Sequence, residues 1–304
     1  MIYPKKINAG AVIGLVSPSS AISEERLHAC YKVLKSMGFS VKLSDNICAD
    51  KGGYMAGDER VRAAWINRMF ADPEVDAIFC VRGGDGGNRV IPYLDLDVIR
   101  ANPKIFVGYS DITSFHLLFN QQCDLITFHG PMVSSNLVDH CDPETKLALF
   151  SCLNADDTYA YVPPAGFDIK TLRPGVAEGP ITGGNLTVIC TSIGTPYEVD
   201  TKGKILFLED LDAHIGNLDR MVYQLKNAGL IDQAKGIIIG QFTDCRNDRE
   251  DYDINQVVLD ATEGLDIPVM SNIQSGHGFP MITIPMGATC RMDTYASNIL
   301  FYTK

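Results

Sequence analysis

A serine at a bend between a predicted strand and a predicted helix is the sharpest chemical feature of the sequence. An apolar run ends at Val107, and Ser110 lies just before a segment with helical spacing. A serine in this position is lifted out of the sheet, and the backbone N–H of Asp111 can donate to an oxyanion. The usual elbow is G-x-S-x-G, but Ile112 replaces the second glycine. A serine that only caps a helix would give the same pattern.

A nucleophilic serine needs a general base, and histidine is the usual one. Among six histidines, His277 is the leading candidate because glycines at 276 and 278 let the backbone aim the imidazole into a cleft. His129, which ends a predicted strand, is an alternative. The remaining histidines lie in predicted helices or polar loops: His28, His116, His140 and His214.

The base in turn needs an acid that orients it. A buried-strand pattern beginning at residue 205 ends in Glu209, Asp210 and Asp212. The carboxyl ends of strands are where α/β proteins collect their site residues, so Glu209 is the candidate acid, with the two aspartates as alternatives. Solvated acids at a strand end would look the same. No other ligands stand at metal-binding spacing, so we expect neither a metal nor a cofactor.

A glycine-rich loop, Arg82 to Gly87, follows another predicted strand and admits two functions. Its N–H groups could supply a second oxyanion donor, with Gly83 or Gly84 closest. Alternatively, the sequence G-G-D-G resembles the phosphate-holding loop of the NAD kinase and phosphofructokinase folds. A flexible turn is the third reading. Against a kinase, no serine or threonine follows the loop and no basic cluster accompanies it.

The elements that position these residues alternate between short apolar runs and helical patterns. Predicted strands cover 11–16, 40–43, 77–81 and 105–107, and helices follow Ser23, Asp58 and Ser110. Repeated β-α-β units predict a parallel sheet covered by helices on both faces. In the helix after Asp58, we expect Val61, Trp65 and Met69 to share the buried face.

This regularity ends after residue 131, and the polar, proline-containing stretch around 156–174 predicts a domain junction. We therefore expect an N-terminal domain over 1–155, a linker over 156–175 and a C-terminal domain over 176–304. The second half is more β-rich, with predicted strands at 204–208, 236–241, 268–273 and 282–291. Helices are predicted at 143–153, 185–192 and 218–228. The fold class is two-domain α/β.

Composition excludes several classes of partner. The 304 residues carry 26 basic and 37 acidic side chains, a net charge of −11, without a basic cluster. We therefore expect neither a nucleic-acid nor a membrane partner. No apolar run approaches the ~20 residues of a membrane span, and the N-terminus reads as a core strand rather than a signal peptide. The nine scattered cysteines resemble reduced thiols, which predicts a cytoplasmic protein.

Several short motifs occur together in a specific order. They are Tyr54-Met-Ala-Gly-Asp58, Arg82-Gly-Gly84, Gly108-Tyr-Ser-Asp-Ile-Thr113, His129-Gly-Pro-Met132, Gly183-Gly-Asn-Leu186, Leu208-Glu-Asp210, Gly276-His-Gly-Phe-Pro280 and Ile284-Pro-Met-Gly287. Over nearly the whole chain, this set resembles the LD-carboxypeptidase family of serine peptidases, which includes muramoyl-tetrapeptide carboxypeptidases and microcin-immunity hydrolases. The resemblance implies a flavodoxin-like N-terminal domain with a parallel sheet and a β-rich, swivelling C-terminal α/β domain.

The resemblance also assigns roles. It implies that Ser110 is the nucleophile, Glu209 and His277 complete the triad, and the backbone N–H groups of Asp111 and Gly84 form the oxyanion hole. One departure is Asp85, which stands where many members have an aromatic residue. Because the hole uses backbone groups, this change concerns the local substrate contacts instead.

The activity implied is removal of the C-terminal D-alanine from a murein tetrapeptide during cell-wall recycling. The residue before D-alanine can be meso-diaminopimelate or lysine. A carboxypeptidase needs a cation or an N–H nest for the substrate carboxylate, and the candidate substrate contacts are Arg82, Arg89 and Asn185. A homodimer is common in similar proteins.

Three alternatives stay open. The nearest is a microcin-immunity-type hydrolase of aminoacyl-nucleotide conjugates, whose members tend to be longer and to use additional aromatic stacking residues. This chain has a single tryptophan, Trp65, on an expected core face, which favours the murein peptide. The others are an ATP-dependent kinase with the G-G-D-G loop and a non-catalytic binding module.

Overall fold

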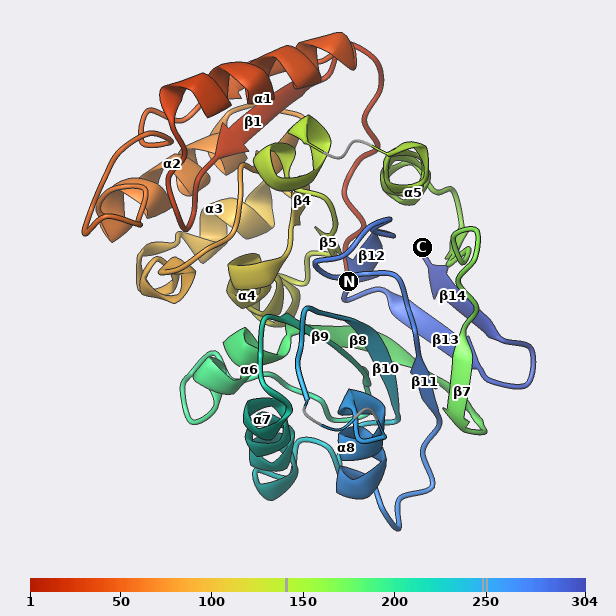
Figure 1. Cartoon of the computed structure of the whole chain (residues 1–304). Helices are drawn as coiled ribbons and strands as arrows, with labels where there is room; N and C mark the ends of the chain where they lie inside the picture. Colours follow the sequence, from red (N-terminus) through yellow and green to blue (C-terminus); the bar gives the residue numbers. More distant parts are fainter. Residues whose placement is uncertain (140–141, 248, 250) are drawn as a thin grey trace. The chain divides into compact units, whose positions relative to one another are not determined.

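The computed structural model describes every residue except 140, 141, 248 and 250, and it divides the chain into two compact units (Figure 1). Unit 1 consists of residues 1–155 together with 283–285. Unit 2 consists of residues 156–282 and 286–304. The segment 156–175, expected to be a linker, contains two short strands, β6 (Thr158–Ala160) and β7 (Lys170–Arg173), which both belong to the second sheet.

The sheet of unit 1 has the order β12-β5-β4-β3-β1-β2, and strands β1 to β5 pair in parallel. The order 2-1-3-4-5 is that of flavodoxin-like folds, as expected. The loops after β1 and β3 leave the sheet at the point where the strand order reverses, which is where such folds bind ligands. Its strands are β1 (Val12–Val16), β2 (Ser40–Leu43), β3 (Ala77–Cys80), β4 (Ile105–Gly108), β5 (Thr127–His129) and β12 (Ile284–Met286).

The helices of unit 1 begin where capping residues predict. Ser23 caps α1 and Asp58 caps α2, each accepting a backbone N–H from the first turn. Asp142 caps α5 in the same way. The helices are α1 (Glu24–Ser36), α2 (Glu59–Ala71), α3 (Leu96–Ala101), α4 (Thr113–Cys123) and α5 (Pro143–Leu153), with short 3-10 turns at Gly87–Arg89, Ile91–Tyr93 and Ser110–Ile112 and a π-helical turn at Val133–Val138.

The expected buried face of α2 is correct at Met69, but at the start of the helix Arg62 takes the buried position expected of Val61. Arg62, Ile66 and Met69 are buried, whereas Val61 is 46% exposed. Trp65 is only partly buried, and the guanidinium of Arg68 lies over its ring. The apolar pattern misled because the residue that faces the core, Arg62, is charged.

Unit 2 is built on an eight-stranded mixed sheet with the order β6-β14-β13-β8-β9-β10-β11-β7. Strands β8 to β11 pair in parallel, while β13, β14, β6 and β7 join antiparallel at the two sides. Helices α7 and α8 lie side by side (Figure 1). The further elements are β8 (Val176–Asn185), α6 (Leu186–Ser192), β9 (Ile205–Leu211), α7 (Ile215–Asn227), β10 (Gly236–Thr243), α8 (Ile254–Ala261), β11 (Val269–Ser271), β13 (Thr289–Asp293) and β14 (Asn298–Tyr302).

The strand expected over 282–291 is in fact two strands. β12 adds to the sheet of unit 1 and β13 to the sheet of unit 2. Gly287 stands between them with φ +89°, a conformation that interrupts an extended run and that glycine adopts without strain. The eight described cysteines form no disulfide, and Cys141 lies outside the described residues. None of the described helices combines the length and apolarity that a membrane crossing requires.

Candidate active site

The nucleophile candidate, Ser110, sits in a strained elbow between β4 and α4. Its φ is +65°, which is uncommon for a residue with a side chain, and it is only partly buried. Gly108 makes the sharp bend compatible with packing, because a Cβ there would come within 2.9 Å of Ile112. The sharp bend therefore forms with a single glycine, Gly108, before the serine, although Ile112 replaces the second glycine of the usual motif.

Asp111 joins the elbow to the glycine loop. Its buried carboxylate accepts the backbone N–H of Gly87 at 2.7 Å, and burial raises the pKa of this carboxyl. Gly83 packs directly against Ser110, since a Cβ on it would lie 2.9 Å from the Cβ of Ser110 and 3.1 Å from its Oγ. Thus the backbone N–H of Asp111 lies next to Ser110, while its side chain holds the glycine loop at Gly87.

The orientation of the Gly83–Gly84 peptide follows from Ser20. The carbonyl of Gly83 accepts the N–H of Ser20 at 3.2 Å, so the N–H of Gly84, on the opposite side of the same trans peptide, points away from Ser20. Gly84 has φ +108°, and a Cβ there would lie 2.1 Å from the Ser20 hydroxyl. Within the described part of the chain, no acceptor meets this N–H, as an oxyanion donor requires.

A buried arginine that the sequence analysis missed fixes the base of the glycine loop. Arg62 donates to the carbonyl of Pro18 at 2.6 Å and to that of Gly86 at 2.9 Å, and burial lowers the pKa of its guanidinium. It therefore ties the loop after β1 to the loop after β3. The helical spacing of α2 would have placed Arg62 on the buried face only if that face had been taken to begin at residue 62 instead of residue 61.

His116 supports the elbow from beneath and is not a base candidate. It is fully buried, its Nε2 lies 2.8 Å from the carbonyl oxygen of Gly108, and its Nδ1 lies 2.9 Å from the hydroxyl of Thr127. Burial lowers its pKa to about 4, so it is neutral near pH 7. His129 is also fully buried and packs against the rings of Tyr109 and His116.

In unit 2, the structure brings Glu209 and His277 together. The Oε2 of Glu209 lies 2.7 Å from the Nδ1 of His277, and the carboxylate is completely buried. Burial raises the pKa of Glu209, although the neighbouring His277 opposes this effect. Gly276, at φ +144°, is required for the approach, because its Cβ would lie 3.0 Å from Oε2. The flanking glycine thus provides space as well as flexibility.

The other two acids at the end of β9 have structural partners. Asp210 accepts the N–H and the hydroxyl of Thr187 and the amide of Asn185, so it fixes the start of α6. Asp212 is exposed and pairs with Arg246 at 2.6 Å. Neither takes the orienting position that Glu209 occupies.

Gln241, also missed in the sequence, clamps the loop that carries His277. Its Oε1 accepts the N–H of Gly278 at 2.9 Å, and its Nε2 donates to the carbonyl of Pro280 at 3.2 Å and to Gln274 at 3.0 Å. Gln241 lies in β10 where the pairing with β9 shifts register, an irregularity often found beside active sites. The sequence could have indicated Gln241 as a site residue, because it is a polar residue near the carboxyl end of an apolar parallel strand.

The remaining candidates lie in varied surroundings. Arg82 is exposed, and Arg89 lies 3.6 Å from Glu59. The side chain of Asn185 is buried, where it accepts the N–H of Val188 and donates to Asp210. His28 is exposed in α1, His214 caps α7, and His140 lies outside the described residues.

The geometry can support acyl transfer with two sets of groups. Unit 1 supplies a partly buried serine hydroxyl beside backbone N–H donors, and unit 2 supplies an imidazole oriented by a buried carboxylate. The glycine loop is followed by only three residues of 3-10 helix, Gly87–Arg89, so it lacks the α-helix N-terminus that phosphate-binding glycine loops use. This difference disfavours the kinase reading.

Comparisons with known proteins agree with this chemistry. The family model of the LD-carboxypeptidase N-terminal domain matches residues 13–130, and that of the LD-carboxypeptidase C-terminal domain matches residues 178–292. A probable murein peptide carboxypeptidase of Bacillus subtilis is 37% identical over 96% of this chain and 91% of its own length. The microcin self-immunity protein MccF of Escherichia coli is 29% identical over 95% of this chain and 92% of its own.

Solved structures give the same result. The apo structure of wild-type MccF superposes with a TM-score of 0.92 at 25% identity, covering 99% of this chain and 98% of that one. A muramoyltetrapeptide carboxypeptidase from Oxalobacter formigenes gives 0.84 at 26% identity, covering 96% and 98%.

Proposed function

This chain belongs to the LD-carboxypeptidase family of peptidases, and on that premise we propose that it is a serine carboxypeptidase that removes the C-terminal D-alanine from murein tetrapeptides. The observation that carries the proposal is the Glu209–His277 pair, with 2.7 Å between the buried carboxylate and Nδ1. The murein substrate is supported by the 37% identical relative named for murein peptides. Within this proposal the reaction serves cell-wall recycling in the cytoplasm.

In the proposed reaction, the hydroxyl oxygen of Ser110 attacks the peptide carbonyl before D-alanine. Because Glu209 holds Nδ1 of His277, Nε2 is the nitrogen that takes the hydroxyl proton. Glu209 keeps the imidazole in that tautomer and stabilises the imidazolium. His277 then returns the proton to the amine of the departing D-alanine, and water activated by the same imidazole releases the acyl group from Ser110.

The oxyanion of each tetrahedral intermediate accepts hydrogen bonds from the backbone N–H groups of Asp111 and Gly84. Losing one such donor typically costs about 10²–10³-fold in rate. The carboxylate of Asp111 and the Ser20–Gly83 hydrogen bond maintain this arrangement before substrate arrives. In the proposed enzyme, the Asp111 carboxylate and Ser20 hold the two oxyanion donors in place and do not gain or lose protons during the reaction.

The test is release of D-alanine from L-Ala-γ-D-Glu-meso-diaminopimelyl-D-Ala by the wild type, Ser110→Ala and Ser114→Ala. Ser114 lies one turn further along, in α4, and is the matched control. We expect release by the wild type and the control and a loss of at least about 10⁴-fold in Ser110→Ala. Wild-type turnover in Ser110→Ala would rule out Ser110 as the nucleophile.

A second candidate is hydrolysis of aminoacyl-nucleotide conjugates, as in microcin immunity. The TM-score of 0.92 against MccF favours it, and one structure of that protein contains aspartyl sulfamoyl adenosine. The two functions separate when the tetrapeptide and a peptidyl-adenylate are compared at equal concentration. Cleavage of only the adenylate, lost in Ser110→Ala, would replace the murein proposal with this one.

A further inference from the structure

A pocket of about 370 Å³ in unit 2 begins directly after the histidine of the proposed triad. Gly278 and Phe279, the two residues that follow His277, form part of its wall. Since consecutive Cα atoms are about 3.8 Å apart, the wall begins within a few ångströms of the backbone at His277. The pocket and the imidazole are therefore neighbours along the chain, although His277 itself is not among the lining residues.

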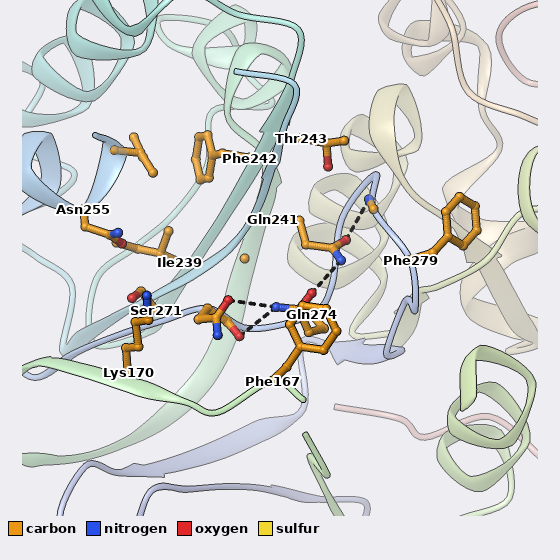
Figure 2. A pocket seen from close by; sticks show the side chains of 14 residues that line it. Phe167, Lys170, Ile239, Gln241, Phe242, Thr243, Asn255, Ser271, Gln274 and Phe279 are labelled. Atoms are coloured by element: carbon orange, nitrogen blue, oxygen red, sulfur yellow. Dashed lines mark hydrogen bonds between the residues drawn. The ribbon is translucent and has the colours of Figure 1, made fainter. Parts of the chain in front are cut away.

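Two polar groups in the pocket have no protein partner. Lys170 and Ser271 face each other across the antiparallel pair of β7 and β11, so their side chains lie on the same face of the sheet, side by side in Figure 2. The hydroxyl of Ser271 is buried, with the residue only 1% exposed, and it makes no hydrogen bond. Within the described residues, the ammonium of the exposed Lys170 likewise has neither an ion pair nor a hydrogen bond.

The remaining lining residues are apolar or carry amides, apart from the hydroxyl residue Thr243. Phe167 and Phe279 lie on different sides of the pocket in Figure 2, and the amides of Gln241 and Gln274 bond to each other. None of the 14 lining residues is acidic, although the chain carries a net charge of −11. The pocket therefore has a local charge opposite to that of the molecule.

We propose that Lys170 and Ser271 form a carboxylate subsite, in which the ammonium and the hydroxyl donate to one carboxylate and the phenylalanine rings contact the apolar part of the ligand. A buried hydroxyl without a partner costs free energy, and an anionic acceptor beside the ammonium supplies both groups with a hydrogen bond. This inference deepens the proposed function, on which its choice of ligand rests: the carboxylate belongs to the peptide substrate.

The first experiment is independent of turnover. Fluorine NMR measures binding of fluorobenzoate, and of neutral fluorobenzamide, to the wild type, Lys170→Met, Ser271→Ala and Lys202→Met. Lys202 is an exposed lysine of unit 2 outside the pocket, so it is the matched control. We expect fluorobenzoate affinity to fall about 10-fold in the two pocket variants only, with fluorobenzamide weak throughout. Equal affinity of all four proteins for fluorobenzoate would overturn the subsite.

Thermal unfolding of the same proteins guards against a general loss of structure. Removing an unsatisfied hydroxyl should leave the Tm of Ser271→Ala equal to or above that of the wild type, even though the variant binds the carboxylate less well. If Ser271→Ala instead lowers both Tm and affinity while Lys170→Met binds normally, Ser271 has a structural role and the subsite is rejected.

The second experiment identifies the substrate carboxylate. Calorimetry with Ser110→Ala compares the tetrapeptide with three amides, one at the free α-carboxyl of the γ-linked glutamate, one at the free carboxyl of meso-diaminopimelate and one at the C-terminus. Each is measured with and without Lys170→Met. The subsite's carboxylate is the one whose amidation abolishes the effect of Lys170→Met, whereas an effect that survives all three amidations contradicts the assignment. A protein that binds fluorobenzoate but no tetrapeptide would refute the murein function and leave the subsite intact.

Discussion

At the scale of single residues, burial and hydrogen-bond partners together separate the roles of the three acids at the end of β9: Asp210 is buried but is bound to Asn185 and Thr187. Glu209 is completely enclosed and contacts His277, whereas Asp212 is exposed and pairs with an arginine. Low-dielectric surroundings strengthen the hydrogen bond from Nδ1 to the carboxylate, which is the property an orienting acid needs. Sequence spacing alone could not choose among the acids, because the choice depends on which side chain the His277 loop reaches.

His116 should give the protein a specific pH dependence. Its pKa is about 4 in the folded protein and about 6.5 when unfolded, so between these values the unfolded state binds more protons. Stability is therefore complete above pH 6.5 and declines as the pH falls towards 4, by up to about 3 kcal/mol. Urea unfolding at pH 7 and pH 5 should show this loss in the wild type.

The variant His116→Gln serves as the control, because its amide can still donate to the carbonyl of Gly108 but does not titrate. We expect it to be less stable at pH 7 and to lose less further stability at pH 5 than the wild type. Equal pH slopes for the two proteins would mean that other groups cause the acid sensitivity.

At the scale of elements, the His277 loop depends on β10 for its position. Gln241→Ala removes hydrogen bonds to Gly278 and to Pro280, so we expect kcat for the proposed reaction to fall about 10–100-fold with little change in KM. Gln241→Glu keeps an acceptor for Gly278 but loses the amide donor, and should fall in between. Steady-state kinetics with Gln233→Ala, an exposed glutamine in the same unit, provides the reference.

A purely structural role for Gln241 predicts a different pattern. In that case Tm would fall, while kcat per folded molecule would stay at the wild-type value. Hydrogen exchange over residues 275–280 distinguishes the two, since the clamp predicts faster exchange confined to that loop.

The elements also show where sequence patterns succeed. Caps at Ser23, Asp58 and Asp142 marked helix starts correctly because capping is local. The face of α2 was wrong at the start of the helix because a buried arginine satisfied by backbone carbonyls looks like a surface residue. Gln241 was missed for a related reason: its partners are separated from it by more than 30 residues.

At the scale of the whole molecule, the chain contributes to unit 1 twice. Residues 1–155 form most of it, and 283–285 return as part of β12 beside β5. No sequence pattern indicated this return, since 282–291 reads as one continuous apolar strand. Glu209 and His277 are likewise 68 residues apart, so local patterns suggested each as a candidate, and the family resemblance joined them in one triad.

The return of β12 predicts that unit 1 cannot be cut out at residue 155 without loss. β5 is fully buried, and a Cβ on Gly130 after it would lie 2.9 Å from the Thr283 hydroxyl, so removing β12 exposes a buried strand with an unpaired edge. We expect the fragment 1–155 to aggregate and to unfold at a lower urea concentration than the same fragment joined to 281–287 by a flexible linker of about 20 residues. A scrambled 281–287 segment on the same linker should behave like the bare fragment. Equal urea midpoints and equal sedimentation for all three proteins would show that β12 contributes nothing to the stability of the first sheet.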